Sequence, residues 1–228
     1  MRIAERPDLV AVTPAVRNVV ERLAAATEGA LAIVSGRPLV EIDGFLTPLV
    51  LPGAGSHGAE RRDYRGMDVP LDRGATALDG AGERIRAHAE AHGLLLEEKS
   101  GGYAVHFRAK PDLEEPTRAL VSAIAAADEG LRVIHGHMVA ELSLAGVDKG
   151  AALDAFMGEK PFAGRVPVAI GDDTTDEDAF RAARARGGLG IRIGGTETCA
   201  QARFEDIDAL HDWLTISADS GMMILETP

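Results

Sequence analysis

Three closely spaced carboxylates follow an apolar run in the second half of the chain. Asp172, Asp173 and Asp176 stand in GDDTTDEDAF, residues 171–180, directly after VPVAI. In open α/β sheets ligands bind at the carboxyl ends of strands, where a cation would relieve the repulsion among these side chains. Such oxygen ligands suit Mg²⁺, which keeps several waters and completes its octahedron with phosphate oxygens. We therefore predict a Mg²⁺ site, the alternative being that these residues only cap the next helix.

Other positions carry groups that bind phosphate. Ser35, Gly36 and Arg37 end another apolar run, and a hydroxyl, a backbone N–H and a guanidinium together can hold a phosphate. An ordinary turn would use the same tripeptide. Lys149 opens a predicted helix and is either a functional residue or a solvated surface lysine. His57, in GSHGAE, is either a turn residue or a ligand contact.

Polar side chains also alternate along predicted strands in the middle of the chain. Alternation places Glu97 and Lys99 on one face of a strand, and His106 and Arg108 on one face of the next. Glu141 lies on a later strand. Half-exposed strands show the same pattern without any binding function, so both interpretations remain open at this point.

The hydrophobic pattern around these residues predicts an α/β fold that is interrupted by an α+β insert. Buried strands are predicted at 30–37, 49–54, 166–173 and 188–193. They alternate with helices predicted at 13–26, from 38, at 149–157, from 177 and at 206–213. Between them, helices at 77–92 and 113–127 are each followed by a strand pair, at 94–108 and 131–144. We therefore predict a core of residues 1–72 and 146–228 with an insert at 73–145.

Composition and charge exclude several classes of protein. The chain has 24 Lys and Arg against 36 Asp and Glu, a formal net charge of −12, and no basic patch for a nucleic acid. A single cysteine, Cys199, cannot form an internal disulfide. No apolar run is long enough to span a membrane, and charged residues occupy the N-terminus where a signal peptide needs an apolar stretch. We expect a soluble, cytoplasmic protein.

Five motifs, in order along nearly the whole chain, resemble the trehalose-6-phosphate phosphatases of the haloacid dehalogenase superfamily. They are SGR at 35–37, GSHGAE at 55–60, EEK…VHFR at 97–108, VAEL…GVDKG at 139–150 and GDDTTDEDAF at 171–180. The resemblance implies a Rossmann-like core with a mobile α+β cap domain inserted into it. It also implies Mg²⁺-dependent removal of phosphate from trehalose 6-phosphate, which gives trehalose.

The resemblance also implies roles for individual residues. Asp172 is expected to bind Mg²⁺ with Asp173 and Asp176 in support, while Lys149 steadies the phosphate and Ser35 binds it. The residues expected to contact the substrate are Arg37, His57, Glu97, Lys99, Arg108 and Glu141. In the family an Arg-Pro pair usually follows the last glutamate of the cap, whereas Ser143 and Leu144 follow Leu142 here.

A larger departure concerns the family's first strand, an apolar strand that ends in D-x-D-G-T just ahead of a segment like IAERPD. In the family mechanism its first Asp attacks phosphorus and its second is the general acid and base. The present sequence has Met1 two residues before Ile3 and contains no D-x-D-G-T. We therefore expect this chain to be inactive as written and two inner strand edges to be unpaired. The alternatives are a non-catalytic sugar-phosphate-binding protein and a phosphatase for another sugar phosphate.

Overall fold

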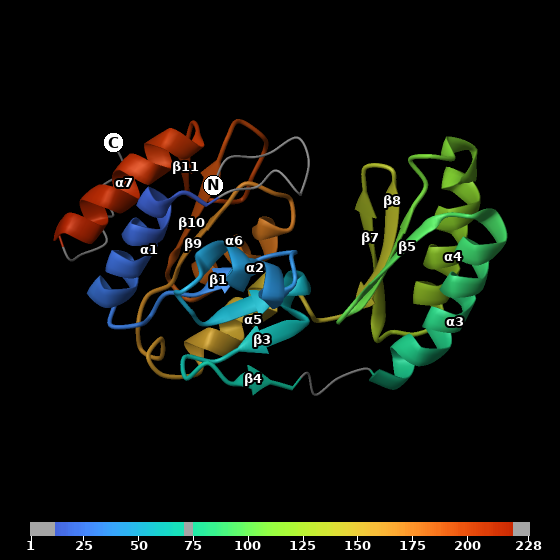
Figure 1. The fold of residues 1–228 in the computed structure, drawn as a ribbon, viewed down its shortest axis with the longest axis horizontal. Coiled ribbons are helices and arrows are strands. Elements are labelled where there is room, and N and C mark those ends of the chain that lie inside the picture. Colours follow the sequence, from blue (N-terminus) through green and yellow to red (C-terminus); the bar gives the residue numbers. More distant parts are fainter. Residues whose placement is uncertain (1–11, 71–74, 221–228) are drawn as a thin grey trace.

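The computed structural model describes residues 12–70 and 75–220 of the chain, which form two units (Figure 1). The core unit comes from both ends of the chain and contains α1 (Pro14–Ala26), β1 (Ile33–Val34), α2 (Leu39–Leu46), β2 (Gly53–Gly55), η2 (Ser56–Gly58), β3 (Glu60–Arg62), β4 (Asp68–Val69), α5 (Lys149–Met157), β9 (Val168–Gly171), α6 (Asp176–Ala185), β10 (Leu189–Ile193), β11 (Ala202–Phe204) and α7 (Ile207–Ser220). The insert contains α3 (Ala75–His92), β5 (Leu95–Lys99), β6 (Gly102–His106), η3 (Pro111–Leu113), α4 (Glu114–Ala126), β7 (Leu131–Gly136) and β8 (Val139–Leu144).

In residues 12–70 and 75–220, the strands of the core unit form two separate β-sheets. In one, the strand order is β1-β2-β3-β4, with β1 and β2 parallel and the remaining pairs antiparallel. In the other, the order is β11-β10-β9 and all neighbours are parallel. Within residues 12–70 and 75–220, β1 pairs only with β2 and β9 only with β10. Whether the inner edges of β1 and β9 are unpaired in the whole chain stays a prediction.

Helices join these two sheets. Helix α5 packs on the first sheet, where Ala152 and Phe156 cluster with Ala54 of β2, and it also packs against α6. Phe180 of α6 clusters with Ala169 of β9, so α6 covers the second sheet. Helices α1 and α7 lie side by side at the far end of the core unit (Figure 1). Of the helices in the described ranges, none is both long and apolar enough to span a membrane.

The start of α1 follows the signals in the sequence. Thr13 is the N-cap, and its hydroxyl accepts a hydrogen bond from the amide of Val16 at 3.3 Å. Pro14 occupies the first helical position, where its missing N–H leaves no hydrogen bond unmade. The apolar side of the helix then buries Leu23.

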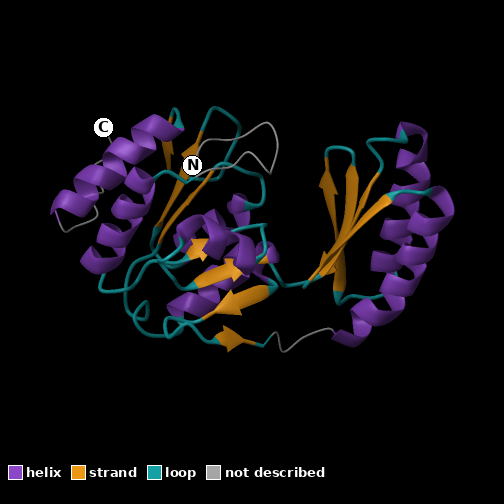
Figure 2. Cartoon of the chain, viewed as in Figure 1, coloured by secondary structure: helices purple, strands orange, loops and turns teal. Residues whose placement is uncertain are grey.

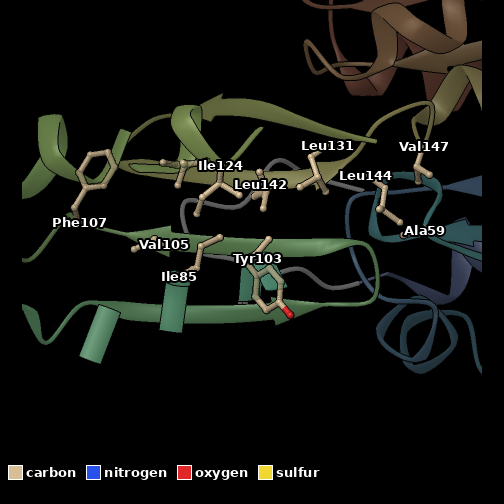
Figure 3. Close-up of a cluster of buried hydrophobic side chains, with 13 residues drawn as sticks. Ala59, Ile85, Tyr103, Val105, Phe107, Ile124, Leu131, Leu142, Leu144 and Val147 are labelled. Atoms are coloured by element: carbon tan, nitrogen blue, oxygen red, sulfur yellow. The ribbon is translucent and has the colours of Figure 1, made fainter. Parts of the chain in front are cut away.

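The insert is a four-stranded antiparallel sheet, in the order β5-β6-β8-β7, with α3 and α4 on one face (Figure 2). Its core lies between that face and the helices, and Figure 3 shows side chains from both. Ile85, Val105, Phe107, Val121 and Leu142 are each at most 1% exposed. Each such side chain contributes roughly 1.5–3 kcal/mol to folding. The opposite face of the sheet is turned toward the core unit (Figure 2).

The structure differs from the sequence-based prediction in the first sheet. The predicted strands at 30–37 and 49–54 are reduced to the short β1 and β2. Pro48 and Pro52 lack the N–H groups that a longer ladder would require. Strands β3, β4 and β11 were not predicted, because the charged residues in ERR, DV and ARF leave no apolar run. Helix α7 extends beyond the predicted 206–213.

Candidate functional site

The first residue of α5 forms a buried ion pair with the first residue of α6. Lys149 is only 7% exposed, and its Nζ donates to Oδ1 of Asp176 at 2.6 Å. Oδ2 of Asp176 accepts hydrogen bonds from the amides of Asp172 at 3.0 Å and Asp173 at 2.9 Å. Asp176 thus ties the loop after β9 to the start of α5. The alternative of a solvated surface lysine at 149 is wrong.

Glycine is required beside this ion pair. A Cβ on Gly171 would lie 2.2 Å from Cγ of Asp176, so a larger residue would displace the carboxylate. The strand therefore ends on a residue without a side chain, and the acidic loop folds back over it. This close approach explains the glycine at the last position of β9.

The carboxylates of Asp172 and Asp173 are exposed, whereas both oxygens of Asp176 are engaged. Thr175, at the N-cap position of α6, makes no side-chain capping bond, but Oδ1 of Asp173 accepts from the amide of Thr174 at 2.6 Å, and Asp176, Glu177 and Asp178 lie in the first turn. In the described part of the chain, no group of three or more His, Cys, Asp or Glu side chains is placed to hold a metal ion. Two exposed carboxylates nevertheless fit Mg²⁺, which takes its remaining ligands from water and phosphate.

Removing Asp176 is expected to destabilise the fold strongly. The Asp176→Ala variant leaves the Lys149 ammonium buried without its partner, and such changes cost about 3–5 kcal/mol. Urea unfolding of the purified chain measures this loss. Asp178→Ala is the matched control, because Asp178 lies in the same helical turn but forms only an outer ion pair with Arg181, expected to contribute less than about 1 kcal/mol. Equal losses in the two variants would contradict a structural role for the buried pair.

Residues 35–37, at the end of β1, are held by the segment that follows β2. The carbonyl of Ser35 accepts from the amide of His57 at 2.9 Å, and that of Arg37 accepts from the amide of Ser56 at 3.0 Å. The Ser35 hydroxyl accepts from the amide of Arg37 at 3.1 Å. A Cβ on Gly36 would lie 2.6 Å from the His57 ring. Loop 35–37 and residues 56–57 thus form one packed structure.

The Arg37 side chain lies along α2. Its Nη1 donates to Oε2 of Glu41 at 2.7 Å, and its guanidinium lies 5.4 Å from the centre of the Phe45 ring. The side chain is 26% exposed. The structure therefore gives Arg37 partners on α2, one helical turn from the loop in which the sequence predicts a phosphate site.

The backbone and ring of His57 hold it beside loop 35–37. Its backbone is left-handed, with φ 58°, its ring is half-buried, and Nδ1 has no hydrogen-bond partner in the described structure. Burial lowers the pKa of His57; Glu141 and Asp173 oppose that shift, and Lys149 and Lys99 add to it. The imidazole is therefore neutral near pH 7. The charges that act on this pKa thus come from the acidic loop, α5 and the insert.

Three of the predicted substrate residues share one face of the insert. Glu97 of β5 and Glu141 of β8 both pair in register with Ala104 of β6, so their side chains point to the same side of the sheet. Lys99, two residues after Glu97 on β5, points to that side as well. Nζ of Lys99 donates to Oε2 of Glu141 at 3.0 Å, with the two side chains 15% and 12% exposed. His106 Nε2 lies 3.2 Å from Oε2 of Glu97. This polar face is the one turned toward the core unit (Figure 2).

Arg108 does not belong to that face. Strand β6 ends at His106, and Arg108 is exposed in the turn that follows. The alternation predicted through position 108 is therefore wrong. The backbone leaves the ladder at Phe107, whose side chain is fully buried beneath the sheet.

Sequence reasoning overlooked Arg192, which braces the acidic loop. This arginine of β10 is 5% exposed, and its Nη1 donates to the carbonyl of Asp173 at 2.9 Å. It also forms an ion pair with Glu177 at 3.3 Å. The sequence did contain a signal for it. Arg192 is a charged residue within the apolar run GLGIRI, and a charged residue in a buried strand needs a buried partner. Glu60 and Ser100, which form a hydrogen bond between the core unit and the insert, were also not predicted.

Comparisons with known proteins agree on one family. The family model described as Trehalose-phosphatase matches residues 1–208. The chain is 37% identical over 214 residues to the trehalose-6-phosphate phosphatase of Escherichia coli, covering 93% of this chain and 80% of that protein.

Solved structures agree on the fold. A trehalose-6-phosphate phosphatase related protein is 26% identical, with a TM-score of 0.74 and coverage of 96% and 93% of the two chains. A haloacid dehalogenase-like hydrolase from B. subtilis is 13% identical, with a TM-score of 0.67 and coverage of 90% and 93%.

Proposed function

The chain belongs to the trehalose-phosphatase family, and from that premise we propose that its substrate is trehalose 6-phosphate and its reaction the removal of the phosphate. The predicted resemblance is confirmed, as is the fold class, a Rossmann-like haloacid dehalogenase core with an α+β insert. The enzyme class that follows from the family is a phosphomonoester hydrolase.

One observation supports the choice of substrate more than any other. Lys149 and Asp173 of the core unit and Lys99 and Glu141 of the insert all act electrostatically on His57 and shift its pKa. The first pair suits a phosphate and its cation, whereas the second offers a hydrogen-bond donor and an acceptor to neutral hydroxyls. A sugar phosphate would present both kinds of group at once. On this basis we propose that the insert, predicted as residues 73–145, is the cap that binds the sugar.

Within this proposal each residue of the core unit has a distinct role. The Ser35 hydroxyl and the Lys149 ammonium bind phosphate oxygens, and Asp176 holds the ammonium in position. Asp172 and Asp173 would hold Mg²⁺, which neutralises the charge of the transferring phosphoryl group when bound. In the insert, Glu97, Lys99 and Glu141 would orient the disaccharide. A cytoplasmic location remains a prediction.

The nucleophile is the missing part of this proposal. The 228 residues contain no D-x-D-G-T, so no residue among them is assigned the attack on phosphorus. This observation favours a second candidate function for the polypeptide as written, namely binding of the sugar phosphate without turnover. The two candidates predict the same ligand and differ in the release of phosphate.

Calorimetry on residues 1–228 tests ligand and metal together. Mg²⁺ alone should bind weakly, because two carboxylates offer it few ligands. With trehalose 6-phosphate present, Mg²⁺ should bind at least about tenfold more tightly, since phosphate oxygens complete its coordination and the two affinities are reciprocally coupled. Asp172→Ala should abolish this coupling, whereas trehalose without phosphate should not produce it in any variant. Equal Mg²⁺ affinity with and without the sugar phosphate would contradict the proposed site.

A further inference from the structure

The carboxylate of Glu60 bridges the two units. Its Oε1 accepts from the hydroxyls of Ser56 at 2.8 Å and Ser100 at 2.7 Å, and its Oε2 accepts from the amide of Leu39 at 2.7 Å. Ser100 lies in the turn between β5 and β6 of the insert, whereas the other two residues belong to the core unit. One side chain therefore contacts the insert, the segment after β2 and the first turn of α2.

Close packing accompanies these hydrogen bonds. A Cβ on Gly101 would lie 2.3 Å from Cβ of Ala59, so the turn between β5 and β6 rests directly on the core unit. Ala59 is 8% exposed and belongs to the hydrophobic cluster of the insert, near Leu144 and Val147 (Figure 3). The insert is therefore docked at a defined point, and Glu60 is adjacent to it.

The same carboxylate supports loop 35–37. Leu39, whose amide Glu60 binds, begins α2 two residues after the loop ends. Ser56, whose hydroxyl Glu60 binds, donates its amide to the carbonyl of Arg37 at 3.0 Å. A displacement of Glu60 would thus affect loop 35–37 both through Leu39 and through Ser56.

Neutral donors alone satisfy this carboxylate in the described structure. Lysine or arginine side chains make no ion pair with Glu60 there, and its partners are two hydroxyls and one amide. Burial raises the pKa of Glu60, but these hydrogen bonds outweigh burial and hold the pKa below its usual value. The negative charge of Glu60 is therefore stabilised by three hydrogen-bond donors. Loss of one donor will alter the hydrogen bonds that the carboxylate makes with the other two.

We propose that Glu60 is a positioning residue that couples the docking of the insert, through Ser100, to the geometry of loop 35–37. The statement that this loop holds the phosphate of the substrate rests on the proposed function. The coupling itself does not. When Ser100 is docked, Glu60 fixes both the start of α2 and the segment that holds the loop.

Hydrogen–deuterium exchange of residues 1–228 without ligand tests the coupling. In Ser100→Ala, the amides of Leu39, Ser56 and His57 are expected to exchange about five- to tenfold faster, because a hydrogen bond to a charged group is lost and the segment opens more often. Ser100→Thr keeps the hydroxyl and should restore slow exchange. Ser122→Ala, an exposed serine of α4, is the matched control and should leave these amides unchanged.

Two results would overturn the proposal. One is faster exchange in Ser100→Ala that stays within β5 and β6 and leaves Leu39, Ser56 and His57 at the wild-type rate. The other is an equal acceleration in Ser122→Ala. Ser100→Ala removes one exposed hydroxyl and leaves the Glu60 carboxylate itself in place, so it tests the coupling directly. Because the readout needs no substrate, its failure is distinguishable from failure of the proposed function.

Discussion

Purified residues 1–228 are expected to release phosphate from trehalose 6-phosphate no faster than their own Asp172→Ala variant. Extending the chain ahead of Ile3 by an apolar strand that ends in D-x-D-G-T should raise the rate by roughly 10⁴-fold or more, since members of a catalytic set act as a unit. The reason is chemical. The reaction needs a carboxylate that attacks phosphorus. The added strand supplies this nucleophile in its first Asp and a general acid and base in its second.

The matched control for this experiment replaces a single carboxylate by an amide. In the extended chain, replacing the first Asp of D-x-D-G-T by Asn keeps the strand but removes the nucleophile, so the gain in rate should disappear. Mg²⁺-dependent turnover by residues 1–228 at a rate well above that of Asp172→Ala would contradict the assignment. A nucleophile within the 228 residues would then have to be sought.

The second large effect concerns recognition of the sugar. In the extended chain, Glu141→Ala is expected to lower kcat/KM for trehalose 6-phosphate by on the order of a hundredfold or more. Glu141 accepts from Lys99 at 3.0 Å in a site where both are largely buried, and truncation leaves buried partners unpaired. Cleavage of a small aryl phosphate should change little, because that substrate has no sugar to bind.

Glu98→Ala is the control for Glu141→Ala. Glu98 lies on the same sheet but pairs with Arg86 of α3 on the helix-covered side, so neither substrate should be affected by its loss. Asp172→Ala should impair both substrates, because its carboxylate serves the phosphate. If Glu141→Ala lowered both activities by one factor, Glu141 would support the fold and the assignment of the sugar site would be wrong.

The sequence was sufficient to predict those features that depend on local pattern. Helical spacing and caps predicted α1, and its structure confirms both Thr13 as the N-cap and Pro14 at the first position. Because ligands bind at the carboxyl ends of strands, Asp172 and Asp173 were predicted to bind a cation, and the structure leaves both residues exposed. Both inferences need only neighbours in the chain.

Features that depend on distant partners could not be predicted in this way. Lys149 and Asp176 were each singled out, but no local pattern indicates that residues 27 apart form a buried pair. Glu60 and Ser100 are 40 residues apart and belong to different units. The end of β6 before Arg108 was missed because alternation of polar residues continues past the point where the ladder stops. Tertiary packing decides such cases.

The packing of α1 against α7 has a consequence for how the chain acquires its structure. These helices lie near opposite ends of the chain, so their contact closes a loop from Ala26 to Ile207. Contacts between such distant segments slow folding, because the entropy of closing the loop is lost before the contact stabilises anything. During synthesis, this part of the core unit must wait until α7 has left the ribosome, whereas the antiparallel insert has all its strands much earlier. We expect the insert to fold first and the core unit to complete its packing last.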